Sequence, residues 1–142
     1  MTSPRRLRQT IEASAQAASA FLSRLQDWCD EGGIHPGVAG PVGLMMDEWL
    51  VNLRTHAYGG RGGPVEITID APSPRRLDVL VRDQAPPFDP TAMPPPDLHA
   101  RLEERELGGL GVHFIRRMAS QIAYRREGQT NELRFTREAD KP

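Results

Sequence analysis

The sequence predicts a two-layer α/β (α+β) sandwich, in which a mixed, mostly antiparallel sheet carries its helices on one face. Two observations support this fold class. Four stretches alternate apolar and polar residues, as strands with one covered face do, and they come as two pairs, each joined by a short turn. Helical patterns precede the first pair and separate it from the second. This order suits one sheet with its helices gathered on one side.

Size and charge narrow the class of protein. We expect residues 1–142 to form one domain, because the chain has the length of a single ordinary domain. The 18 basic and 19 acidic residues nearly cancel, which disfavours nucleic acid as a partner. No apolar run is long enough for a signal peptide or a membrane span, so we expect a cytoplasmic protein. The single cysteine, Cys29, excludes an internal disulfide.

The N-terminal third is expected to be mainly helical. Residues 1–12 carry a weak strand pattern that could equally lead into a helix. The run 14–29 is rich in helix formers, with Phe21 and Leu25 on its apolar side. We expect this helix to end at 32–33, where a glycine can take a left-handed conformation.

A second helix is expected over residues 44–58, which contain no proline or glycine, after a loop or first helical turn at 34–42. On one stripe of this helix Glu48, Asn52 and His56 fall four residues apart, along one line. A carboxylate can take a proton and an amide oxygen can hold a hard cation, so Glu48 and Asn52 together could serve a magnesium-nucleotide reaction. A solvated polar face is the commoner explanation of such a stripe.

The first strand pair is predicted at 65–69 and 76–81, with a short polar turn between them that makes them antiparallel neighbours. A long Pro-rich segment follows Pro90. Segments of this kind are often lids or binding loops, and plain surface excursions are at least as common.

Glycines come directly before the third predicted helix, residues 112–118. Free backbone amides at such a helix start can hold an anion, and the helix dipole adds to the attraction. A closing hairpin is predicted from 121–125 and 131–136, with its turn at 127–128.

Three elements recur in a known order. They are Glu48 and Asn52 on a helix, Asp83 at a strand end followed by Pro87-Phe88-Asp89-Pro90, and Gly108-Gly109-Leu110-Gly111 before a helix. The chain thereby resembles the GHKL (histidine-kinase-like) ATPases, and more closely their anti-sigma regulatory factor and serine kinase branch, over about residues 5–137. The resemblance implies a Bergerat-type fold that holds ATP and Mg²⁺ between its helical layer and a lid at about residues 90–107.

The resemblance also implies a role for each matched residue. Asn52 would ligate magnesium, Glu48 would be the catalytic base, and Asp83 would accept a hydrogen bond from the adenine amino group. The residues implied to bind the nucleotide are Asn52, Asp83, Phe88, Gly108, Gly109, Leu110 and Gly111. One position departs from the family: its usual glycine is Ala85 here, whose methyl group could crowd the base, or fit if its φ is negative.

Any nucleotide site in this chain must hold phosphates with backbone amides, arginine or metal. A Gly-Lys-Ser/Thr phosphate loop is impossible, because the only lysine is Lys141 in the tail. Arg54, Arg105 and Arg116 are the candidates for added positive charge. We expect His56 to make a structural hydrogen bond near the nucleotide and His113 to serve packing.

The function that the resemblance implies is partner switching. Such a protein is an ATP-dependent serine/threonine kinase and anti-sigma factor, which phosphorylates an anti-anti-sigma (STAS) antagonist, sequesters a sigma factor and typically forms a homodimer. The alternative is a non-catalytic nucleotide-binding or protein-binding regulator of the same fold. A histidine kinase is disfavoured, because the stretch before Leu44 is too short for a dimerisation helix bearing a phospho-acceptor histidine.

Overall fold

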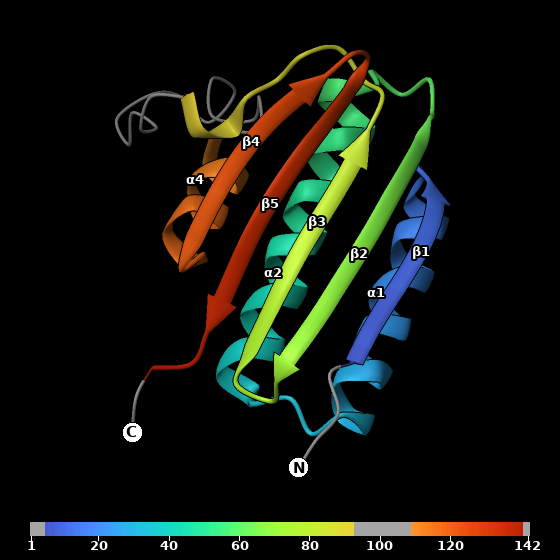
Figure 1. Cartoon of the computed structure of the whole chain (residues 1–142). Helices are drawn as coiled ribbons and strands as arrows, with labels where there is room; N and C mark the ends of the chain where they lie inside the picture. Colours follow the sequence, from blue (N-terminus) through green and yellow to red (C-terminus); the bar gives the residue numbers. More distant parts are fainter. Residues whose placement is uncertain (1–4, 93–108, 141–142) are drawn as a thin grey trace.

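The protein is described here by a computed structural model that covers residues 5–92 and 109–140. In this part of the chain a five-stranded sheet has the order β1-β2-β3-β5-β4, and every neighbouring pair is antiparallel (Figure 1). The strands are β1 Arg5–Glu12, β2 Pro64–Ser73, β3 Arg76–Asp83, β4 Gln121–Glu127 and β5 Thr130–Glu138. The two predicted hairpins are confirmed, and residues 5–12, for which the sequence left two readings open, form an edge strand.

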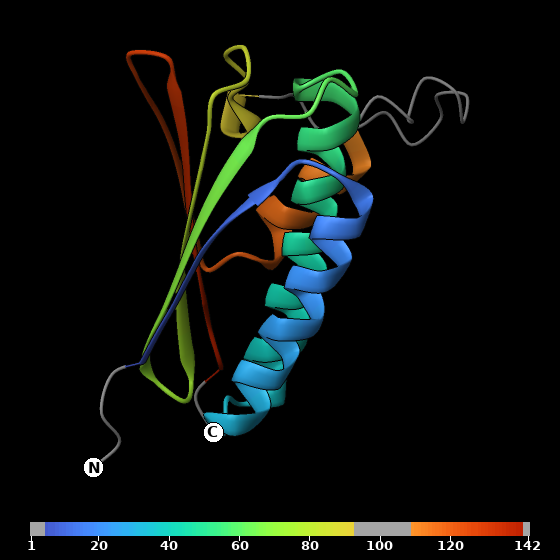
Figure 2. The ribbon, with the colours of Figure 1, turned by 90° about the vertical axis from the view of Figure 1, so that its right-hand side faces the viewer.

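The helices α1 Ala15–Glu31, α2 Pro36–Asn52 and α4 Gly109–Met118 lie on one face of this sheet (Figure 2). The predicted fold class is therefore confirmed. We call this side the covered face and the other side the open face. Two short elements complete the described chain, a π-helical turn η1 at Leu53–Ala57 and a 3-10 turn η2 at Pro90–Ala92. Most of the predicted lid, from residue 93 onward, lies outside the described residues.

Helix α2 begins at Pro36, well before the predicted start at Leu44, even though Pro41 lies inside it. Pro36 occupies the first turn, where a missing N–H costs nothing. Pro41 cannot donate to the carbonyl of Gly37, one turn earlier, and that carbonyl instead accepts a hydrogen bond from Arg137 Nε at 3.2 Å. A contact from the last strand thus replaces the bond that proline removes.

The two faces of the sheet differ in chemistry because strand residues alternate. On β2, Val65, Ile67 and Ile69 point into the core under the helices. The residues between them lie on the open face, where Glu66 pairs with Arg8 at 2.9 Å. No helix in the described ranges is both long and apolar enough to cross a membrane.

Candidate functional site

The functional residues predicted on α2 do not share one environment. Asn52 is buried, at 6% exposure, whereas Glu48 and His56 are exposed. The helix widens directly after Asn52, where η1 begins and the N–H of Tyr58 bonds the carbonyl of Leu53, five residues back. The predicted line of three side chains therefore breaks at this turn. The imidazole of His56 makes no hydrogen bond to the described residues, so the expected structural bond of this side chain is not seen there.

The side chain of Asn52 carries a buried polar atom that the described residues leave without a hydrogen bond. Its Nδ2 is buried and makes no hydrogen bond in the described part of the chain. Leaving such a group unsatisfied costs about 1–3 kcal/mol. This NH2 group lies one helix turn after Glu48, and a hydrogen-bond acceptor on a bound ligand would satisfy it. The other atom of this amide, Oδ1, is a hard oxygen ligand, which fits Mg²⁺ with phosphate oxygens beside it.

The start of α4 lies directly against Glu48. A Cβ atom at Gly111 would lie 2.6 Å from Glu48 Oε2 and 3.6 Å from Glu48 Cβ. A side chain at this position would push the carboxylate of Glu48 aside. Gly109 opens α4, so the predicted glycines form its first turn instead of preceding it. Gly108 lies outside the described residues, as does the side chain of Leu110.

Asp83 ends β3 on the covered face and is almost fully buried, at 3% exposure. Its Oδ1 accepts hydrogen bonds from the backbone N–H of Ala85 at 3.0 Å and from Asn131 Nδ2 at 2.9 Å. Burial raises the pKa of Asp83, while these two bonds and the charge of Arg126 oppose that shift. The second oxygen, Oδ2, takes no hydrogen bond from the described residues and stays available to a ligand.

Ala85, where the family has glycine, fits without strain. No non-glycine residue in the described ranges has a positive φ. The backbone at Ala85 therefore has the negative φ at which a methyl group was expected to fit. The residue is 1% exposed. Its carbonyl accepts hydrogen bonds from Asn131 Nδ2 at 2.9 Å and from Arg126 Nη1 at 3.0 Å.

Two contacts tie the end of α2 to the end of β3. The Tyr58 hydroxyl donates to the carbonyl of Pro64 at 2.7 Å and accepts from the N–H of Gln84 at 2.8 Å. The rings of Trp49 and Phe88 pack with centroids 6.1 Å apart and planes tilted by 31°. These contacts join α2 and the turn after it to the residues after β3, and Gly111 brings the start of α4 against Glu48 of α2.

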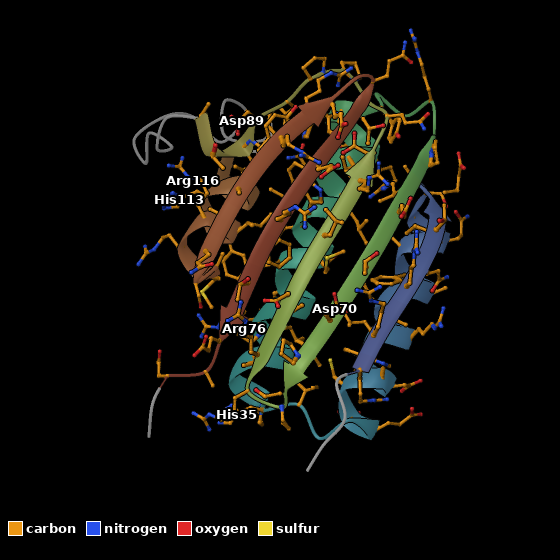
Figure 3. The ribbon with its side chains drawn as sticks, in the orientation of Figure 1. His35, Asp70, Arg76, Asp89, His113 and Arg116 are labelled. Atoms are coloured by element: carbon orange, nitrogen blue, oxygen red, sulfur yellow. The ribbon has the colours of Figure 1, made fainter. Side chains whose placement is uncertain are left out.

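The three arginines that were candidates for positive charge near the phosphates do not lie together. Arg54 lines a surface pocket together with residues of α1, on the side of α2 away from α4. Arg105 lies outside the described residues. Arg116 and His113 lie on α4, with Asp89 at the same side of the molecule (Figure 3). A hollow of about 700 Å³ is lined by charged side chains of the open face, and it lies on the other side of the sheet from the candidate site.

Sequence reasoning missed Asn131 and Arg126, which hold Asp83 and Ala85 in place. Strand alternation could have found both. Asn131 lies two residues before the core residue Leu133 and so shares its face of β5. Arg126 lies two residues after the half-buried Tyr124 and so shares its face of β4. A polar residue at a core-facing strand position near a predicted site is the pattern to look for.

Comparisons with known proteins agree with the fold and show the family. The model of the histidine kinase-like ATPase domain family matches residues 11–137. The serine/threonine-protein kinase BtrW of Bordetella bronchiseptica is 30% identical over 94 residues, which are 66% of this chain and 66% of BtrW. The match thus spans just under two thirds of that relative.

A solved structure shows the same fold. The RsbU and RsbW domains of a Mycobacterium tuberculosis protein superpose with a TM-score of 0.63 at 15% identity, over 97% of this chain and 33% of the other. The family match covers most of the sequence, including the α2, β3 and α4 residues described above. This chain is a member of the histidine kinase-like ATPase domain family, as the order of its three elements predicted.

Proposed function

We propose that this chain is an ATP-dependent serine/threonine kinase and anti-sigma factor, and that residues 1–142 form one such domain. In this proposal it phosphorylates a STAS-type antagonist, sequesters a sigma factor and acts as a homodimer. The observation that carries the proposal is the approach of Gly111 to the Glu48 carboxylate, one helix turn from the buried side chain of Asn52, whose Nδ2 has no hydrogen-bond partner among the described residues.

Each residue has a distinct task in this proposal. Asn52 would hold Mg²⁺, and Asp83 and Phe88 would bind the base. Backbone amides at Gly108, Gly109, Leu110 and Gly111 would bind the phosphates. When bound, Mg²⁺ would neutralise charge on the phosphates. The remaining work is positioning, which is most of what phosphoryl transfer requires of a protein.

Glu48 would take the proton of the attacking serine. The serine oxygen bonds to the γ-phosphorus, the bond to the bridging oxygen breaks, and ADP leaves with that electron pair. An exposed carboxylate suits this role because a protein substrate must reach it. Gly111 leaves room for this carboxylate beside the start of α4, where the phosphates would lie.

The test combines binding and transfer. ATP is titrated with and without Mg²⁺, and radiolabelled phosphate transfer to a purified STAS-domain antagonist is then measured. We expect Glu48→Gln to bind ATP normally and to lose at least about a hundredfold in transfer rate. Asn52→Ala should lose the Mg²⁺-dependent part of ATP binding.

Asp47→Asn is the matched control, because Asp47 is an exposed carboxylate on the same helix that lines pockets with α1 residues. It should transfer phosphate at the native rate. Absence of saturable ATP binding would exclude the proposal. Saturable binding without transfer would favour the non-catalytic regulator, and light scattering at rising protein concentration tests the homodimer.

A further inference from the structure

The side-chain amide of Asn131 is saturated with hydrogen bonds at the base of the candidate nucleotide site. Asn131 is 4% exposed and lies opposite Asp83 in the sheet. Its Nδ2 donates to Asp83 Oδ1 and to the carbonyl of Ala85, each at 2.9 Å. Its Oδ1 accepts from Arg126 Nη1 at 2.9 Å and from the hydroxyl of Tyr124.

Only one orientation of this amide satisfies its neighbours. A guanidinium can only donate, so the atom facing Arg126 must be the amide oxygen. A backbone carbonyl can only accept, so the atom facing Ala85 must be the nitrogen. Arg126 also donates to the Ala85 carbonyl, at 3.0 Å, and thus fixes the amide and the loop together. A network in which every member is satisfied holds its groups rigidly.

The consequence for Asp83 is chemical as well as geometric. Oδ1 already accepts two N–H groups, from Ala85 and from Asn131, so Oδ2 is the one oxygen left for a ligand. Burial raises the pKa of Asp83, and the two donors oppose that shift by stabilising the ionised carboxylate, which can accept a hydrogen bond but cannot donate one. A group with only acceptor capacity binds a 6-amino purine through its N–H and repels the oxygen of a 6-oxo purine.

We propose that Asn131, supported by Arg126, is a positioning residue that sets the selectivity of this site for 6-amino over 6-oxo purine nucleotides. The inference rests on the proposed nucleotide site and adds its specificity determinant. A site built to hydrogen-bond one group rejects an analogue that lacks it far more strongly than an apolar pocket can. Asn131 acts through Asp83 and Ala85 and need not touch the base.

The test is a pair of equilibrium titrations with ATP and with inosine triphosphate. ATP has a 6-amino group and an unprotonated N1, whereas inosine triphosphate has a 6-oxo group and therefore a proton on N1. For the native chain we expect a preference for ATP of at least about a hundredfold. In Asn131→Ala the Asp83 carboxylate loses one of its two donors and can rotate or take up a proton. The ratio of the two dissociation constants should then fall at least about tenfold.

This ratio separates positioning from simple loss of stability. A merely structural role would weaken both nucleotides equally and leave the ratio unchanged. The matched control is Glu132→Gln, the next residue on the same strand, which faces the open face and should keep the native ratio. Arg126→Met, which removes one donor to the Ala85 carbonyl and keeps Asn131, should lower the ratio about two- to fivefold.

The outcomes are distinct. A native preference that survives in both Asn131→Ala and Arg126→Met overturns the inference and leaves the proposed function standing. If the native chain binds neither nucleotide, the inference about Asn131 and the proposed function are both refuted. If Asn131→Ala does not fold, as judged by circular dichroism, the ratio for Arg126→Met decides, and an unchanged ratio there refutes the inference.

Discussion

Two carboxylates are buried at neighbouring positions of the same sheet, and they face opposite sides of it. Asp83 lies on the covered face opposite Asn131, and Glu132 lies on the open face opposite Arg82. They are 3% and 4% exposed, and burial acts against the charge of each of them. Their surroundings nevertheless shift their pKa values in opposite directions.

Glu132 is enclosed by arginines. Arg125 donates to both its oxygens, at 3.1 and 3.2 Å, and Arg134 approaches one of them to 3.4 Å. Burial acts to raise the pKa of Glu132. The hydrogen bonds and charge of Arg125, with the charges of Arg134 and Arg82, outweigh burial and hold that pKa below its ordinary value.

Asp83 has only amide donors. Burial raises its pKa, and the bonds from Asn131 and Ala85, with the more distant charge of Arg126, do not fully cancel that effect. The open-face carboxylate is thus satisfied within the protein, whereas the covered-face carboxylate keeps one oxygen for something else. We infer that the first serves the sheet and the second serves a ligand, and four variants test this contrast.

The largest effect is expected in the core of the covered face. Ile67→Ala should lower the free energy of unfolding by about 2–5 kcal/mol, because it removes fully buried methyl and methylene groups and leaves a cavity. Urea denaturation at pH 7 measures the change. A loss below about 1 kcal/mol would mean that the helical layer does not close over the sheet as described.

The second largest change in the free energy of unfolding is expected at Glu132. Glu132→Gln should cost about 1–2 kcal/mol at pH 7, a charged hydrogen-bond contribution reduced by the exposure of its arginine partners. The folded-state pKa lies below the unfolded one, so this contribution is present above the unfolded pKa and is lost as pH falls through the folded pKa. Urea titrations from pH 7 to acid should show the two proteins converge. Divergence on acidification would contradict the proposed role.

Asp83→Asn should show the opposite trend with pH. Because the folded-state pKa of Asp83 is raised, its favourable contribution is present below the unfolded pKa and is lost as pH rises through the folded pKa. The variant should therefore gain stability relative to the native chain as pH rises, by about 1 kcal/mol. The same denaturation series measures it. If the variant instead loses stability relative to the native chain as pH rises, the carboxylate of Asp83 is as well paired as that of Glu132.

The smallest effect is expected on the open face beside Ile67. Glu66 pairs with Arg8 at 2.9 Å and Arg82 at 3.7 Å, and all three side chains are partly solvated. Glu66→Ala should change the free energy of unfolding by about 0–1 kcal/mol, and less in high salt. Denaturation at two salt concentrations provides the measurement. A cost equal to that of Ile67→Ala would mean that the open face is covered in solution.

Much of this architecture could be predicted from local pattern. The alternation in 65–69 and 76–81 predicted two antiparallel strands, and the helix over 14–29 was predicted to end at 32–33, as α1 does. Gly33 and Gly128 take positive φ at the turns where glycine was needed. These features depend on neighbouring residues only, which is why sequence spacing captures them.

The sequence by itself determined the strand and helix periods, the turns and the order of the three family elements. Tertiary structure alone decided the early start of α2, where Arg137 supplies the bond that Pro41 removes, and the satisfied amide of Asn131 beside Asp83. It also decided that Glu48 lies against Gly111, and that Nδ2 of Asn52 finds no hydrogen-bond partner in the described part of the chain. The reason is physical: periodicity reports which face a residue takes, but hydrogen-bond partners distant in sequence exist only once the chain has folded.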